Sequence, residues 1–103
     1  MDATDAFSAI AGQLLDEPGV IEKTGFGSSP GLRVRGKIFA MLVRDELVVK
    51  LPAERCAALV AGGSARPFDS GRGRVMKQWV TVGAARAPEW PALAREALAF
   101  VGT

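Results

Sequence analysis

Hydrophobic residues recur with a helical period in three segments of the chain. Near the start, five apolar residues fall at i, i+3, i+4, i+7 and i+8 between about Thr4 and Asp16, before a Pro-Gly pair ends the pattern. The same period returns in Pro52–Ala61, which a Gly-Gly pair closes, and again from Trp90 to Val101. Each segment predicts an amphipathic helix with one apolar face on a core.

Short apolar runs separated by turn residues fill most of the chain between the first two helices. The runs are Leu32–Arg35, Ile38–Arg44 and Leu47–Leu51, with tight turns expected at Gly36-Lys37 and Asp45-Glu46. Strands joined by such turns pair antiparallel. The six consecutive apolar residues 38–43 predict a central strand packed on both faces or at its ends. Residues 20–31 are rich in Gly, Ser and Pro, and are expected to form mostly a surface loop.

The rest of the chain completes the predicted sheet. Ser64–Val75 is expected to be mostly irregular, with Phe68 anchoring a short edge strand, and Met76–Val82 is the last strand before a linker loop at Gly83–Pro88. Either face of the last strand could be the core face, because Trp79 is itself a large apolar side chain. The order α-βββ-α-ββ-α predicts an α+β two-layer sandwich with an antiparallel sheet, formed by residues 1–103 as a single domain.

Composition supports an ordinary globular domain. The 103 residues are 49% apolar and 23% charged, and no apolar run is long enough to span a membrane. The acidic N-terminus lacks the basic region of a signal peptide, and a lone cysteine cannot form an internal disulfide. The expected location is therefore the cytoplasm, without a membrane partner.

Charge is unevenly distributed along the chain although the net charge is only +2. Residues 1–22 hold five acidic side chains and no Lys or Arg, whereas residues 23–87 hold twelve Lys or Arg against four acidic side chains. A bipolar surface of this kind can steer an acidic partner such as nucleic acid. The alternative is that the acidic and basic segments neutralise each other in the folded chain.

Residue types that usually carry catalysis are scarce. The sequence has no histidine and no tyrosine, which removes the usual neutral-pH base and most zinc sites. Cys56 lies on an apolar helix stripe and is interpreted as a core residue. Residues 25–31, GFGSSPG, resemble a phosphate loop but lack the Gly-Lys-Ser/Thr ending and the following helix. We therefore expect neither an enzyme nor a bound cofactor or metal.

Basic residues supply the candidate partner-binding site. Arg33 and Arg35 are two positions apart and are expected to project from one face of a strand, and Lys37 would continue that row if the turn does not break it. A second basic group lies beside Trp79, whose ring could stack on a base. The alternative is a solvated loop and a charged outer strand face. Lys50 is expected to reach the sheet edge or to pair with a carboxylate such as that of Glu54. The candidate residues are Arg33, Arg35, Lys37, Arg72, Arg74 and Lys77.

Three motifs carry a family resemblance: GKIFAML, LVVKLPAER and GRGRVMKQW, in that order. With them the chain resembles the TfoX N-terminal domain from about Val20 to Val101, and the related MmcQ/YjbR proteins are similar in the same region. The resemblance implies a two-layer fold of the type shared with secretion chaperones. It also implies a regulatory role, because TfoX proteins are competence regulators that act with transcription factors and YjbR-like proteins are described as DNA-binding. It offers no catalytic residues. Full-length TfoX proteins have a second domain absent from these 103 residues, so activities that need it are not expected.

The sequence therefore favours a small, non-enzymatic regulatory module that binds a macromolecular partner, either DNA or a transcription-related protein. One alternative is a chaperone-like interaction or homodimerisation domain without nucleic-acid binding. Another is a small-molecule-binding domain with a pocket between the helices and the sheet. The sequence does not choose between a monomer and a homodimer.

Overall fold

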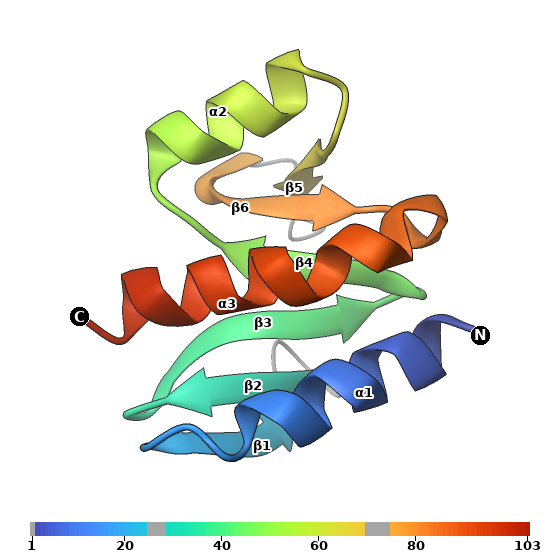
Figure 1. Ribbon diagram of the computed structural model, residues 1–103. Coiled ribbons are helices and arrows are strands. Elements are labelled where there is room, and N and C mark those ends of the chain that lie inside the picture. The colour runs from blue at the N-terminus through green and yellow to red at the C-terminus, as the bar shows by residue number, and fades with distance from the viewer. Residues whose placement is uncertain (1, 25–28, 70–74) are drawn as a thin grey trace.

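The computed structural model describes residues 2–24, 29–69 and 75–103. Within these residues a six-stranded sheet is covered on one face by helices (Figure 1). The helices are α1 (Ala3–Leu14), α2 (Ala53–Ala61), the 3-10 helix η1 (Ala84–Glu89) and α3 (Trp90–Val101). The strands are β1 (Val20–Thr24), β2 (Pro30–Val34), β3 (Lys37–Val43), β4 (Glu46–Lys50), β5 (Arg66–Asp69) and β6 (Val75–Val82).

All neighbouring strands are antiparallel, in the order β1-β2-β3-β4-β6-β5. The last strand of the chain therefore lies between β4 and β5. The predicted α+β class and its layering of helices on an antiparallel sheet are confirmed. The structure adds β1, which pairs with β2 from Val20 opposite Val34 onwards, where the sequence predicted mostly a loop. The predicted linker at residues 83–88 is largely the helix η1.

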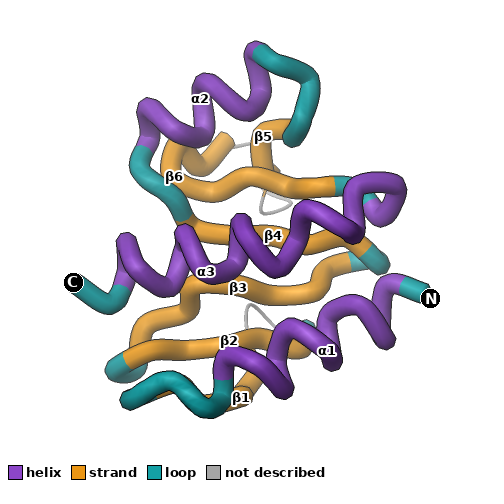
Figure 2. The backbone as a smooth tube through the Cα atoms, viewed as in Figure 1, coloured by secondary structure: helices purple, strands orange, loops and turns teal. Residues whose placement is uncertain are grey.

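Helices α1 and α3 run side by side across the same face of the sheet, and α2 lies beyond them near β6 and β5 (Figure 2). Helix α1 starts slightly before the predicted Thr4, because the Asp2 carboxylate caps it by accepting a hydrogen bond from the Asp5 N–H at 2.8 Å. The main core lies between this helix layer and the sheet. Its largest buried side chains include Ile10, Leu14, Leu32, Phe39, Leu47, Leu51, Val82 and Trp90.

A second, smaller apolar cluster lies on the opposite face of the sheet. It is formed by Met41, Val48, Phe68 and Trp79, with Ile38, Val43 and Met76 packed against it. Trp79 therefore faces away from the helices, while its neighbours Val80 and Val82 face the main core. This settles the orientation of β6 that the sequence left open.

A bulge in β3 explains how six consecutive apolar residues are used. Leu32 pairs with Ala40 but the next residue, Arg33, pairs with Ile38, so Phe39 is an extra residue in the ladder. Phe39 and Ala40 both reach the main core, whereas Ile38 and Met41 pack on the opposite face. The prediction that this strand packs on both faces is confirmed.

Both hairpin turns lie one residue earlier than predicted. Their central residues are Arg35-Gly36 and Arg44-Asp45, all four of which have positive φ. Two-residue turns of this kind need positive φ at both positions to match the twist of the strands. Gly36 tolerates this conformation at no steric cost, but Arg35 and Arg44, at φ 52° and 50°, do so only with some strain.

Candidate functional site

The described basic candidates come together at one end of the sheet. The start of β3 lies next to the end of β2 because Lys37 pairs with Val34, and the end of β4 lies next to the middle of β6 because Lys50 pairs with Trp79. The antiparallel pairing of β3 with β4 places these two corners at the same end (Figure 1). We call this region the basic end; its cationic residues are Arg33, Arg35, Lys37, Lys50 and Lys77.

The predicted one-sided row of Arg33, Arg35 and Lys37 is wrong, because the turn breaks it. Strand β2 ends at Val34, and Arg35 is exposed in the turn. Paired residues share a face of a sheet, so Arg33 opposite Ile38 points away from the helices, while Lys37 opposite Val34 points toward their side. The three cations therefore surround the tip of the hairpin instead of lining one face.

Arg33 has a role within the hairpin itself. Its side chain is half-buried, and its Nη1 donates a hydrogen bond to the Gly36 carbonyl at 3.1 Å. This contact ties the strand to its own turn. Arg35 and Lys37 are exposed, so they are better placed than Arg33 to reach a partner.

In the second basic group, Arg72 and Arg74 lie outside the described residues. Lys77 is exposed on β6. Trp79 is only 6% exposed, and its ring lies 6.4 Å from that of Phe68. The expected stacking of Trp79 on a base is therefore wrong, because the ring is already buried against other side chains. The Lys50 ammonium lies 5.9 Å from the Trp79 ring centroid, a cation–π contact that replaces the two placements predicted for Lys50.

The ion pairs among the described residues involve other cations than Arg35, Lys37, Lys50 and Lys77, although the carboxylate of one pair, Glu17, lines the same shallow pocket as Arg35. They join Arg55 to Glu96, Arg66 to Glu46, Arg86 to Glu89 and Arg95 to Glu17. None of these four pairs joins the acidic residues 1–22 to the basic residues 23–87, because Arg55 and Arg86 pair with glutamates near the C-terminus and Glu17 pairs with Arg95. No described carboxylate forms an ion pair with Arg35, Lys37, Lys50 or Lys77. Arg35, Lys37 and Lys77 are also exposed and keep their charge available to a partner, whereas the half-buried Lys50 lies over the Trp79 ring.

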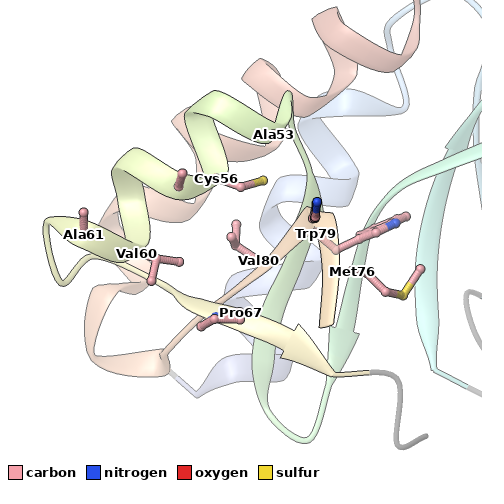
Figure 3. A pocket seen from close by; sticks show the side chains of 10 residues that line it. Ala53, Cys56, Val60, Ala61, Pro67, Met76, Trp79 and Val80 are labelled. Carbon is pink, nitrogen blue, oxygen red and sulfur yellow. The ribbon is translucent and has the colours of Figure 1, made fainter. Parts of the chain in front are cut away.

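An apolar groove adjoins the basic end; the sequence offered a pocket between the helices and the sheet only as an alternative, and did not predict its lining residues. It has a volume of about 400 Å³ and lies between α2 and the strands β5 and β6 (Figure 3). Lys77 is the charged residue in its lining. The hint of a groove in the sequence was a row of alanines beside Cys56 on α2. Alanine side chains are too small for this row to be recognised as an apolar helix stripe.

Comparison of the sequence with models of protein families gave a match that covers most of the chain. The YjbR family model matches residues 15–99. The chain belongs to the YjbR family. That part of the resemblance seen in the sequence is confirmed, and the likeness to the TfoX N-terminal domain stays a prediction. Neither the curated proteins nor the solved structures contained a match to this YjbR-family chain.

Other kinds of site can be assessed over the described part of this YjbR-family protein. No group of three or more His, Cys, Asp or Glu side chains in those residues is arranged to hold a metal ion. Among the same residues, none of the helices combines the length and the apolar character needed to cross a bilayer.

The one cysteine is a buried residue of α2. The Cys56 thiol donates a weak hydrogen bond to the Leu51 carbonyl at 3.5 Å, and burial raises the pKa of this thiol above its ordinary value. The thiolate is the nucleophilic form, so the folded domain disfavours reaction at this position. The interpretation of Cys56 as a core residue is confirmed.

The burial of Cys56 leads to a prediction about the reactivity of its thiol. Cys56 in the native protein should react with a thiol reagent such as dithionitrobenzoate at least about tenfold more slowly than in the protein unfolded in guanidinium, since its pKa is raised and its access reduced. Because the folded pKa is the higher one, the stability linked to this thiol is fully present below the unfolded pKa and is lost as the pH rises through the folded pKa. Equal reaction rates in the two states would contradict the buried position.

Proposed function

We propose that this YjbR-family domain is a non-enzymatic regulatory module that binds DNA through the basic end of its sheet. The observation that carries the proposal is the convergence of cations from the β2–β3 turn, β4 and β6 at one end, with no ion pair from a described carboxylate to Arg35, Lys37, Lys50 or Lys77. Contacts to phosphate supply most of the affinity of non-specific DNA binding.

The spacing of these cations suits a phosphate backbone. Strands β2 and β6 are separated by β3 and β4, which is three strand spacings or about 14 Å. Duplex DNA carries one negative charge for roughly every 1.7 Å of its axis, so several phosphates lie within that span. Exposed Arg35, Lys37 and Lys77 are the side chains we expect to make these contacts.

The affinity should depend on salt in a way that reflects the number of phosphates neutralised. We predict that Arg35→Asn, Lys37→Gln and Lys77→Gln together weaken binding to random duplex DNA and reduce the slope of log K against log salt by up to about 3, close to 0.9 for each phosphate that is no longer neutralised. Fluorescence anisotropy with a labelled duplex across a salt series measures both quantities. Arg33 is left unchanged because it holds the turn together.

The chain offers a matched control for the hairpin residue. Arg44 occupies the corresponding turn position at the opposite end of the sheet, with nearly the same φ as Arg35. Asparagine tolerates positive φ, so Arg35→Asn and Arg44→Asn each remove one charge without adding backbone strain. Only Arg35→Asn should weaken binding. Equal losses in the two variants would exclude the basic end as the DNA-binding surface. Wild-type protein that does not bind DNA even at low salt would exclude DNA binding and favour a protein partner.

A further inference from the structure

The apolar groove has two walls of different origin. One is a helical stripe of α2, in which every member lies three or four residues from another: Ala53, Cys56, Ala57, Val60 and Ala61. The facing wall comes from the strands and includes Pro67, Met76, Trp79 and Val80 (Figure 3). A volume of about 400 Å³ lies within the range of small-molecule sites in proteins.

Two local features keep this space open. The stripe on α2 is built mainly from alanines, whose side chains are too short to reach the opposite wall. The ladder between β5 and β6 is also interrupted, because Pro67 pairs with Val80 whereas the next residue, Phe68, pairs with Met76. Along this stretch β6 advances from Met76 to Val80 while β5 advances by a single residue, and a bulge of this kind bends the strand locally. The groove is therefore built into the backbone.

One end of the groove favours an anion. The Leu51 N–H donates to the Gln78 carbonyl at 2.9 Å, so Lys77 lies close to the start of α2. Helix α2 begins at Ala53, which lines the groove, and its N-cap Pro52 provides no side-chain acceptor for the free N–H groups of the first turn. A lysine and the positive end of a helix dipole thus meet at this end. Glu54, the acidic residue of that turn, is exposed and is not part of the lining.

We propose that this groove binds a small amphiphilic carboxylate. Its aliphatic or aromatic body would lie between α2 and β6, against Ala57, Val60 and Val80, and its carboxylate would pair with Lys77 beside the first turn of α2. The apolar walls supply affinity through burial of the body, and the single cation supplies orientation. This site does not depend on the proposed DNA binding, although both would use Lys77.

The probe is octanoate, kept well below its micellar concentration, with uncharged octanol and short-chain acetate as comparisons. Titration is followed by tryptophan fluorescence, since Trp79 lines the groove, and by amide shifts in ¹⁵N-labelled protein. We expect saturable binding of octanoate with shifts centred on α2 and the start of β6, weaker binding of octanol, and no binding of acetate. No DNA is present, so the result stands apart from the DNA experiment.

Two substitutions on neighbouring positions of α2 test the location. Ala57→Leu fills the groove and should weaken octanoate at least about tenfold, whereas Ala58→Leu, exposed and outside the lining, should leave it unchanged. Lys77→Gln should weaken octanoate by about fivefold, the scale of one partly exposed charged contact, and leave octanol unchanged. Circular dichroism confirms that each variant is folded.

Three outcomes would overturn the proposal. The first is the absence of saturable shifts with octanoate at millimolar concentration. The second is an equal effect of Ala57→Leu and Ala58→Leu, which would place the ligand elsewhere. The third is equal binding of octanol and octanoate that Lys77→Gln does not change, which would exclude recognition of the carboxylate.

Discussion

Replacing Trp90 by alanine is expected to lower the free energy of unfolding by about 3–5 kcal/mol, the range for removing a large buried aromatic side chain. Trp90 is fully buried at the junction of η1 and α3, and its indole N–H donates a hydrogen bond to the Gly83 carbonyl at 3.2 Å. The substitution therefore leaves a cavity in the main core and an unpaired carbonyl. Small domains have only about 5–15 kcal/mol of stability, so much of it would be lost.

Chemical denaturation followed by circular dichroism measures this loss. Trp90→Phe is the matched control, because it keeps most of the apolar volume and removes the hydrogen bond, with an expected cost of about 1–2 kcal/mol. Equal costs for the two variants would mean that the ring volume contributes little and that the helix layer is packed differently from the structure.

Replacing Trp79 by alanine is expected to cost about 3 kcal/mol, by the same loss of buried aromatic volume on the opposite face of the sheet. Trp79 is the largest member of the second cluster and contacts Phe68 from the edge strand. The expected cost is as large as for a residue of the main core because the cluster packs on the central strands β4 and β6. Denaturant unfolding measures it, and a cost below about 1 kcal/mol would show that this cluster adds little to the fold.

A double-mutant cycle isolates the contact with Lys50. Lys50→Met keeps the length of the side chain and removes its charge, and Trp79→Leu keeps apolar volume and removes the ring. The coupling energy between the two substitutions should be about 0.5–1 kcal/mol, as for a partly exposed cation–π pair. Additive effects would mean that Lys50 packs beside the ring without being attracted to its face.

The sequence predicted the helices well because their apolar stripes are long and regular. The strands around β3 were also predicted, but the all-apolar composition of β3 does not show where its pairing register changes. Six consecutive apolar residues look the same whether or not one of them is a bulge, so the extra position at Phe39 could not be recognised. Strand β1 was missed because it precedes residues rich in Gly and Ser, and its pairing with β2 is a tertiary feature. The turns were shifted because Arg35 and Arg44 adopt a conformation that sequence rules reserve for Gly, Asn and Asp.

The candidate site was predicted only in part, because its geometry depends on register. Spacing along β2 suggested a row of cations, yet the positive φ at Arg35 ends the strand and separates Arg33 from Lys37. What brings Lys77 to the same end is the insertion of β6 beside β4, which no local pattern encodes. The groove depends on the same long-range pairing and on small side chains that leave space. Neither feature produces a hydrophobic pattern along the sequence from which the groove could be located.

The place of β6 in the sheet also has a consequence for how the chain reaches its fold. Strands β1 to β4 follow each other in the sheet as they do in the sequence, so they can pair through short loops. Strand β4 can complete its pairing only when Leu47, Val48 and Val49 meet β6, which comes after α2 and β5 in the chain. Long loops slow such pairing. Until β6 arrives, the exposed apolar edge of β4 is the part of the nascent domain most prone to aggregate with another chain.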